Sequence, residues 1–333
     1  MPGTQFDVVA IGNAIVDIIG RCDDAFLERH GAPKGHMRLV DTATIGSIYG
    51  SMGPAIEISG GSAANTAAGI ASLGGRGAFI GKVAEDEFGR IFRHDIRAAG
   101  VAFNTPAVAD SSQGTSRSLI LVTPDGQRTM NTFLGISTDL DQGEVDPAVI
   151  QAANIVYLEG YLFDRDEAKA AFRQAVDIAN KAGRQVALTL SDSFCVNRHR
   201  DEFLALIRSG IGILFANEGE ILSLYETTSF DEAVKRVGQD TRLAVLTRSE
   251  KGSVIVSEGE SITVAADPVR KVIDTTGAGD LYAAGFLFGV ARGYDLSVAG
   301  QLGSFAAAEI IGQMGARPEV KLSHLARMRG LIG

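Results

Sequence analysis

Short apolar runs alternate with amphipathic segments along most of this 333-residue chain, and that alternation restricts its fold more than any other feature. The runs that predict buried strands are Asp7–Ile11, Ala78–Ile80, Ile155–Glu159, Gln185–Leu190, Ile213–Ala216, Leu243–Thr247 and Ser253–Val256. Between them lie helical patterns, such as the one over Asp166–Ala182. Buried strands separated by helices are typical of an α/β protein with a doubly wound, mostly parallel sheet. Ligands of such sheets bind beyond the C-terminal ends of the strands.

Two stretches, 17–59 and 104–134, interrupt this pattern with residues that alternate as in exposed strands. Thr115–Val122 and Gln127–Thr132 flank the sequence Pro124-Asp-Gly126, which is typical of a hairpin turn. The two stretches therefore predict a small second sheet. The main α/β domain is then expected to consist of residues 1–16, 60–103 and 135–333.

A Gly-rich turn in the last quarter of the chain joins Val269–Ile273, a predicted strand, to the apolar, helix-like stretch Leu281–Val290. The first amides of a helix that follows such a turn have no helical partners, and with the helix dipole they form an anion site. The carboxylate of Asp280 would repel a bound phosphate, but it suits a group that takes a proton from a nucleophile attacking that phosphate. The segment therefore indicates phosphoryl transfer. The alternative is that Asp280 only begins a helix and that the glycines shape a tight turn.

A second Gly-Gly turn opens a helix of small residues. The residues of this block are Gly60, Gly61, Asn65, Gly81, Asp86 and Gly89. At this block and at Asp274-Thr-Thr-Gly-Ala-Gly-Asp280, the chain closely resembles the two signatures of the PfkB (ribokinase-like) family of carbohydrate and nucleoside kinases. Asn217-Glu-Gly-Glu220 is similar to the family's Asn-x-x-Glu motif near the magnesium and the phosphates. The resemblance covers essentially the whole chain and implies that stretches 17–59 and 104–134 form a lid over the substrate.

The resemblance also implies roles for individual residues. Asp280 would be the general base toward a substrate hydroxyl, and the amides around Gly277, Ala278 and Gly279 would hold the transferring phosphoryl group. Asn13 and Asp17, which follow the first strand, would hydrogen-bond vicinal hydroxyls; the alternative is a capping Asn and a solvated Asp. The other expected substrate contacts are Gly60, Gly61, Asn65, Met37, Leu39 and Phe133.

ATP and Mg²⁺ are the implied cofactors. The expected ATP-binding residues are Asn217, Thr247, Arg248, Gly252, Gly277 and Gly279. Glu220 is expected to contact Mg²⁺ through water, although it could instead be an ordinary residue of a first helical turn. Arg128 resembles a lid arginine that closes onto the phosphates; the alternative is a surface arginine of a hairpin. Asp274 and Thr276 match the region where many family members hold a monovalent cation, for which K⁺ is the candidate.

The first lid stretch is long, includes a predicted helix over Asp41–Tyr49, and presents the apolar residues Met37 and Leu39. In this it looks most like adenosine kinases, and a purine has a broad apolar face that such side chains suit. We expect an ATP-dependent kinase that phosphorylates a primary hydroxyl of a nucleoside or sugar, with adenosine favoured. Ribokinase, fructokinase and 2-keto-3-deoxygluconate kinase activities stay open, as does a catalytically silent ligand-binding member of the fold.

Charge and motifs argue against other classes of protein. The net charge of −9 disfavours nucleic acid and anionic membranes as main partners. A Walker A loop would need a glycine where Arg76 stands and Ser or Thr where Val83 stands, and the first strand lacks the glycine spacing of a dinucleotide site. The chain starts without a basic leader, and no apolar run reaches membrane-spanning length. We therefore expect a cytoplasmic protein that acts on a small molecule as a monomer or homodimer.

Overall fold

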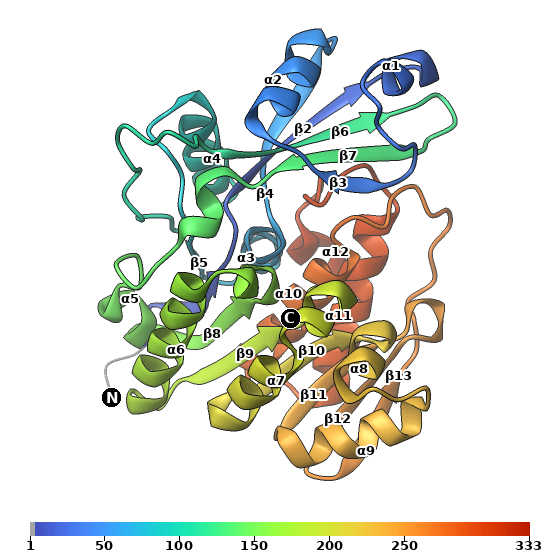
Figure 1. Cartoon of the computed structure of the whole chain (residues 1–333). Coiled ribbons are helices and arrows are strands. Elements are labelled where there is room, and N and C mark those ends of the chain that lie inside the picture. The colour runs from blue at the N-terminus through green and yellow to red at the C-terminus, as the bar shows by residue number, and fades with distance from the viewer. Residues whose placement is uncertain (1–3) are drawn as a thin grey trace.

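The computed structural model describes residues 4–333; residues 1–3, which begin the predicted main domain, lie outside the described residues. Its larger sheet has eight strands, and β12, next to the edge strand β13, runs antiparallel to both of its neighbours while the other pairs are parallel (Figure 1). In order across the sheet these are β13 (Glu260–Val264), β12 (Ser253–Ser257), β11 (Leu243–Thr247), β10 (Ile213–Asn217), β9 (Gln185–Thr189), β8 (Ala153–Glu159), β1 (Phe6–Ile11) and β5 (Gly77–Ile80). The sequence-predicted strands of this sheet are confirmed. The edge strand β13 was not predicted, because only its last residue, Val264, is buried.

Helices cover both faces of this sheet, as a doubly wound fold requires. One layer consists of α3 (Ser62–Ser72), α10 (Ala278–Ala291), α11 (Leu296–Ile311) and α12 (Leu322–Met328). The other consists of α5 (Pro147–Gln151), α6 (Asp166–Lys181), α7 (Ser193–Gly210), α8 (Glu218–Tyr225) and α9 (Phe230–Asp240). Successive side chains of a strand point to opposite faces, so Val8 and Val9 of β1 belong to two different hydrophobic cores.

A second sheet of five strands lies beyond the C-terminal ends of the main strands, at the top of Figure 1. Its order is β3 (Met37–Leu39), β7 (Arg128–Phe133), β6 (Ser116–Val122), β2 (Ile15–Arg21) and β4 (Ala55–Gly60). The helices α1 (Asp24–Arg29), α2 (Thr42–Ser51) and α4 (Glu87–Ala98) accompany it. The predicted hairpin and the predicted helix in the first stretch are confirmed. The division into a main domain and a lid stays a prediction.

The strand predicted over Val269–Ile273 is wrong. The segment between β13 and α10 is irregular, and it bonds to the end of α11, where the amides of Ile273 and Asp274 both donate to the carbonyl of Ile311. The side chains of Val272 and Ile273 remain 58% and 45% exposed, so the apolar residues of this segment are not buried as in a central strand. Within the described residues, the segment pairs with no strand of either sheet.

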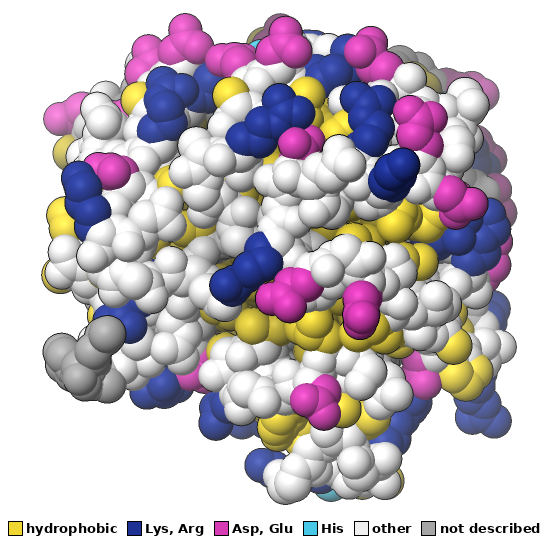
Figure 2. All heavy atoms as spheres, turned by 90° about the horizontal axis from the view of Figure 1, so that it is seen from below, with side chains coloured by type: hydrophobic (Ala, Val, Ile, Leu, Met, Phe, Trp, Pro, Cys, Tyr) yellow, Lys and Arg dark blue, Asp and Glu magenta, His cyan; other side chains and the backbone are white. Residues whose placement is uncertain are grey.

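Figure 2 shows the surface of the molecule on the side away from the second sheet. Lys and Arg side chains are interspersed there with Asp and Glu. These cations do not merge into one basic surface on that face. Across residues 4–333, no helix is both long and apolar enough to cross a membrane.

Candidate active site

A cavity of about 710 Å³ lies between the two sheets. On the main-sheet side it is lined by Glu159, Thr189, Asn217 and Thr247, which end the neighbouring strands β8, β9, β10 and β11. This is the edge where ligands of parallel sheets bind. The second sheet closes the opposite side with residues of β2, β3, β6 and β7.

Asp280 lies in the first turn of α10 and lines this cavity. Its two carboxylate oxygens accept hydrogen bonds from the Ser62 hydroxyl at 2.6 Å and from the Asn65 side-chain amide at 2.9 Å. Burial raises the pKa of Asp280, while Ser62, Asn65 and the guanidinium of Arg317 pull that pKa back toward its ordinary value. The carboxylate is therefore held in a fixed direction by two donors, with lone pairs left for a substrate proton.

The turn before α10 exposes amides to the cavity. Gly277 has φ 77°, a left-handed conformation that favours glycine, and its carbonyl accepts from the amide of Leu281 at 2.8 Å. The amide of Ala278 already donates to the carbonyl of Thr275 at 3.2 Å, so it is not fully free as expected. Within the described chain, the amides of Gly279 and Asp280 have no such backbone partner outside the helix. These two amides are the available donors for an anion.

Glu159, which was not predicted from the sequence, holds Asn13 and the start of α3 at the cavity. One of its oxygens accepts from the backbone and side-chain amides of Asn13 at 3.2 and 2.7 Å, and the other accepts from the Ala63 amide at 2.8 Å. The side-chain oxygen of Asn13 in turn accepts a hydrogen bond from the Ser137 hydroxyl at 2.9 Å. Burial raises the pKa of Glu159 to about 7, although its three donors oppose the rise. Asn13 is therefore clamped from both ends of its side chain.

Asn65 and Asp17 present acceptors to the same region. Within the described residues, the side-chain oxygen of Asn65 is buried without a hydrogen-bond partner, and the residue lines the cavity. An orphaned buried acceptor is costly unless a ligand donates to it, so a substrate hydroxyl fits here. Burial raises the pKa of Asp17 to about 7. Asp17 also lines the cavity, and a Cβ on Gly60 would lie 2.2 Å from its carboxylate.

The two glycines of the Gly-Gly turn thus differ in what they do. Gly60 is not among the residues that line the cavity; it leaves room for the Asp17 carboxylate. Gly61 does line the cavity, and its φ of 96° together with the nearby carbonyl of Asn13 excludes a side chain.

Arg317 lies under this turn and was not predicted, because no motif marks it. Its guanidinium donates to the carbonyl of Ser59 at 2.8 Å, to the Ser59 hydroxyl at 3.0 Å and to the carbonyl of Ala64 at 2.8 Å. Asp95 of α4 accepts from the amide and hydroxyl of Ser59 at 2.7 and 2.6 Å. Burial lowers the pKa of Arg317 to about 10, with Asp95, Asp17 and Asp280 opposing the fall. The arginine fastens the junction of β4 and α3, from which Ser62 and Asn65 reach Asp280.

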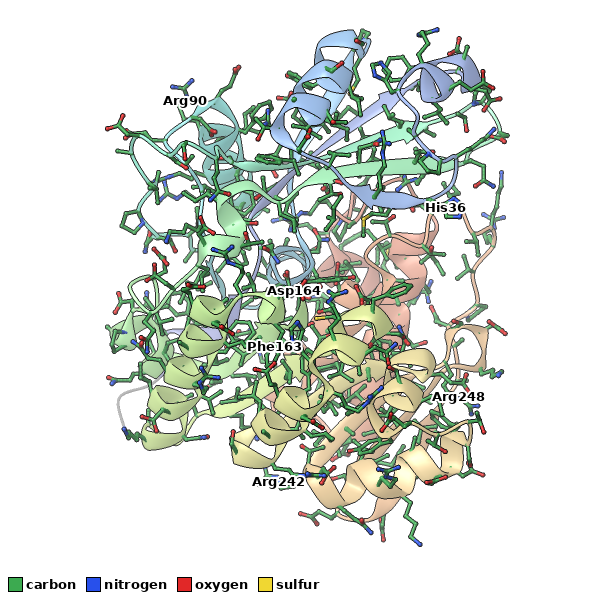
Figure 3. The ribbon with its side chains drawn as sticks, viewed as in Figure 1. His36, Arg90, Phe163, Asp164, Arg242 and Arg248 are labelled. Atoms are coloured by element: carbon green, nitrogen blue, oxygen red, sulfur yellow. The ribbon has the colours of Figure 1, made fainter. Side chains whose placement is uncertain are left out.

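The expected ATP residues divide into two groups. Asn217 and Thr247 line the cavity with the glycines of the turn, whereas Arg248 and Gly252 do not. Arg248, labelled in Figure 3, donates to Glu218 at 2.7 Å, and its guanidinium lies over the Phe230 ring. Gly252 has φ 82° and sits where a side chain would strike the carbonyl of Val264, so it shapes the turn before β12.

Glu220 forms a capping box at the start of α8. It accepts from the backbone and side-chain amides of Asn217 at 2.9 and 2.6 Å, and burial raises its pKa to about 7. Both residues line the cavity. Within the described residues, no group of three His, Cys, Asp or Glu side chains could hold a metal ion. The Glu220 carboxylate at the cavity fits Mg²⁺, which is commonly bound through water and substrate phosphates rather than by a protein cage.

Arg128 does not reach the free amides of the turn by any described contact. It extends from β7 and forms a buried ion pair with Asp274, and it also donates to the Thr276 hydroxyl at 3.2 Å. Asp274 further accepts from the amide and hydroxyl of Thr276 at 3.0 and 2.8 Å, and from the amide of Gly315 at 2.8 Å. A carboxylate has about four lone-pair sites, and donors occupy all of them. This arrangement does not fit a monovalent cation on the Asp274 carboxylate.

One end of the cavity is apolar. Met37 and Leu39 of β3 and Met130 of β7 line it from the second sheet. Tyr161 and Phe194, which were not predicted, line it from the side of the main sheet and keep 40% and 77% of their surface exposed. Each follows the end of a main-sheet strand, which is the signal that could have revealed them. Phe133 does not line the cavity: strand alternation points Thr132 and Leu134 into it, while Arg117 lies over the Phe133 ring.

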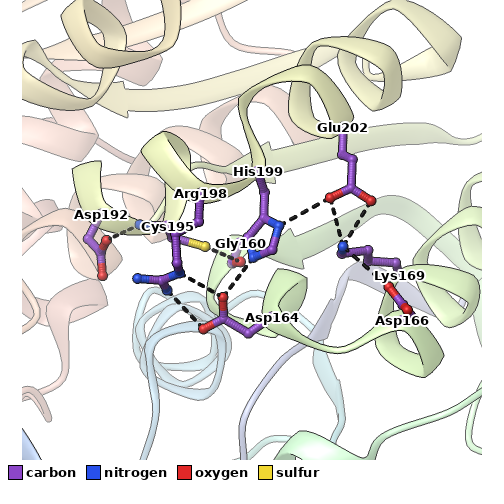
Figure 4. Close-up of polar contacts among 9 residues, drawn as sticks. All are labelled: Gly160, Asp164, Asp166, Lys169, Asp192, Cys195, Arg198, His199 and Glu202. Atoms are coloured by element: carbon purple, nitrogen blue, oxygen red, sulfur yellow. Dashed lines mark hydrogen bonds and ion pairs between the residues drawn. The ribbon is translucent and has the colours of Figure 1, made fainter.

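A charged network borders the cavity beside this apolar end (Figure 4). Asp164, which Figure 3 labels between the two sheets, accepts from Arg198 at 2.9 and 3.1 Å and contacts His199 at 2.8 Å. His199 also contacts Glu202, which Lys169 holds at 2.7 Å. Only Asp164 and Arg198 of this network line the cavity.

The chain is similar along almost its whole length to solved kinase structures. The adenosine kinase from Sinorhizobium meliloti is 53% identical, with a TM-score of 0.90 over 98% of this chain and 99% of that one. A probable sugar kinase from Rhizobium etli is 49% identical, with a TM-score of 0.91 over 99% of this chain and 100% of that one. A 5-dehydro-2-deoxygluconokinase from Shouchella clausii is 26% identical over 93% of this chain and 91% of its own length.

The family match agrees with these similarities. Residues 57–321 match the pfkB family carbohydrate kinase, a range that includes the Gly-Gly turn, the Asn-x-x-Glu motif and the turn before Asp280. Kinases of this family are phosphotransferases, and membership implies ATP and a divalent metal ion. The chain therefore belongs to the pfkB family of carbohydrate kinases, as a sugar or nucleoside kinase.

Proposed function

We propose that this protein is an ATP-dependent nucleoside kinase that converts adenosine to AMP, with Asp280 as its general base. The observation that carries the nucleoside assignment is the composition of the cavity. One end offers hydrogen-bonding groups suited to a ribose, and the other offers the aromatic side chains of Tyr161 and Phe194 opposite Met37 and Leu39. A bare sugar is polar on every side and would leave that second end unused, whereas a purine has a flat apolar face to fill it.

In the proposed reaction, the primary hydroxyl of the acceptor attacks the γ-phosphorus of ATP. A new oxygen–phosphorus bond forms, the bond to the β–γ bridging oxygen breaks, and ADP leaves. Asp280 accepts the hydroxyl proton, while Ser62 and Asn65 keep its carboxylate aimed at the acceptor. The free amides of Gly279 and Asp280, at the positive end of α10, stabilise the charge on the phosphoryl oxygens.

The residues proposed to orient the substrate include Asn13, which hydrogen bonds hold in place. Asn13, fixed by Glu159 and Ser137, and the Asp17 carboxylate are proposed to bind the vicinal hydroxyls of the ribose. A bound Mg²⁺ would supply positive charge to the phosphates. Asn217 and Glu220 would hold that ion through water, and Thr247 would face the nucleotide. Arg128 is proposed to act indirectly: its ion pair with Asp274 supports the turn that leads into α10.

Steady-state kinetics with adenosine, ribose and fructose test this assignment. We expect the highest kcat/KM for adenosine. Met37→Asp and Leu39→Asp should raise KM for adenosine without abolishing turnover, because a charge at the apolar end opposes base binding but leaves the reacting groups in place. The matched control is Ile56→Asp, an exposed residue of β4, the opposite edge strand of the same sheet, which does not line the cavity. Equal effects of all three substitutions would show that the two lid residues act on stability alone.

The second candidate is a kinase for a free sugar acid or sugar. The similarity to the 5-dehydro-2-deoxygluconokinase favours it, since that relative is matched over nearly its full length. A preference for ribose, fructose or 5-dehydro-2-deoxygluconate over adenosine would overturn the nucleoside assignment and leave the kinase assignment standing.

A further inference from the structure

We propose that the guanidinium of Arg128 takes the place of a monovalent cation at Asp274, so that the lid itself supplies the positive charge at the start of the anion-binding turn. The proposal concerns the Arg128–Asp274 ion pair and does not depend on which substrate is phosphorylated. The resemblance to the family implies a potassium-type ion in this region, and the contacts described above leave no acceptor lone pair for one.

Each oxygen of the Asp274 carboxylate is fully used. One oxygen accepts the amide and the hydroxyl of Thr276, and the other accepts the amide of Gly315 and the Arg128 guanidinium. All four partners are donors, whereas a bound cation would need oxygen lone pairs directed at it. The side chains of Arg128 and Asp274 are only 11% and 3% exposed, so the pair is shielded from competing salt.

The pair joins two parts of the molecule that are far apart in sequence. Arg128 begins β7 of the second sheet, and Asp274 begins the turn that leads into α10. A displacement of β7 would move the Arg128 guanidinium away and leave the Asp274 carboxylate without its balancing charge. The same carboxylate accepts from the Thr276 amide, so this loss would act directly on the turn. The shape of the turn and the position of the lid are therefore coupled through one buried ion pair.

Thermal unfolding without any substrate provides the first test. Wild-type protein should have the same Tm in KCl, NaCl and choline chloride at equal ionic strength. Arg128→Met keeps much of the side-chain volume but leaves Asp274 buried without its cation, and should lower Tm in choline chloride by roughly 5 °C or more. KCl should then raise the Tm of this variant in a concentration-dependent way, because the ion can bind the exposed lone pair.

Matched variants separate this role from general charge effects. Lys34→Met removes another lid cation, one that pairs with Asp24 and Asp125 on the surface, and should show no potassium response. Arg128→Lys keeps a positive charge and should remain independent of potassium. Should Arg128→Met fail to fold, the double variant Arg128→Met, Asp274→Asn removes both charges and should fold without responding to potassium.

Activity gives the second readout. The kcat of the wild type should not change when KCl replaces choline chloride, whereas the kcat of Arg128→Met should be low in choline chloride and partly restored by KCl. A wild-type enzyme that requires potassium would overturn the proposal, as would an Arg128→Met variant whose Tm is the same in all three salts. An absence of phosphorylation in every protein would contradict the proposed function but leave the Tm test intact.

Discussion

At the scale of single residues, Asp280 is the group on which the proposed chemistry depends. Its oxygens are oriented by a hydroxyl from Ser62 and an amide from Asn65, which are more than two hundred residues away in sequence. Two donors to one carboxylate keep its pKa from rising as far as burial alone would take it. The net effect still leaves the pKa of Asp280 above its ordinary value, which makes its carboxylate a stronger base toward a hydroxyl proton.

Replacement of Asp280 by asparagine should keep the shape of the turn and remove the proton acceptor. We expect kcat to fall by roughly 10²–10⁴, the usual worth of a positioned base, with little change in nucleotide affinity. Rapid-quench kinetics and equilibrium titration with ATP check the two expectations separately. Asp295→Asn, in the loop before α11, is the control, and a near-normal kcat for Asp280→Asn would remove the assigned role.

At the scale of elements, the junction between β4 and α3 connects the second sheet to α10, the helix that carries Asp280. Its backbone is fixed from below by Arg317 and from the side by Asp95, which both bind Ser59. The same guanidinium lowers the pKa values of Asp17 and Asp280 through its charge.

Arg317→Met should therefore change the pH dependence of catalysis. Loss of the positive charge raises the pKa of Asp280, so this base becomes protonated at a higher pH than in the wild type, and the acidic limb of kcat/KM should move to higher pH. The charged groups that face Arg317 are Asp95 of α4, Asp17 of β2 and Asp280 of α10. Arg317→Lys should restore part of the shift. Arg329→Met, which removes an exposed arginine paired with Asp267 and Glu309, should leave the profile unchanged.

The elements also explain what the sequence could predict. Local patterns suffice where burial follows from a single segment, as in β8 and β10 or in the helix that begins at Asp166. The Gly-Gly turn and the turn before Asp280 are local too, because their chemistry depends on neighbouring residues. Glu159, Phe194 and Arg317 escaped notice, since their importance comes from partners that only the folded chain brings near. The strand prediction over Val269–Ile273 failed for the opposite reason. Its apolar residues suggested burial, but within the described residues the segment pairs with no strand.

At the scale of the whole molecule, several carboxylates facing the cavity, among them Asp17, Glu159 and Glu220, are more basic in the folded protein than in an unfolded chain. Burial raises the pKa of Asp17 from 3.8, and that of Glu159 from 4.5, to about 7. A raised carboxyl pKa means that the folded state binds the proton more tightly than the unfolded state. The free energy of unfolding should consequently fall as pH rises from about 4 toward 7, with no further loss from these two groups above pH 7.

Calorimetry of the ligand-free protein between pH 5 and pH 8 measures this dependence. We expect a higher Tm at pH 5.5 than at pH 7.5. Asp17→Asn carries no titrating group at that position and should show a flatter curve, while Asp166→Asn, an exposed residue on α6, should follow the wild type. A Tm that rises steadily toward pH 7.5 in the wild type would contradict the expected sign.

Arg317 donates a hydrogen bond to Ser59, which lies 258 residues earlier in the chain, and this separation matters during synthesis on the ribosome. A ribosome releases the chain from its N-terminus, so the Gly-Gly turn and the strands of the second sheet emerge long before the arginine that fastens them. Until residue 317 has left the exit tunnel, the junction that holds Ser62 and Asn65 lacks its arginine, and until residue 280 has emerged the proposed base is absent. The candidate site can therefore form only after Arg317 has been synthesised and released.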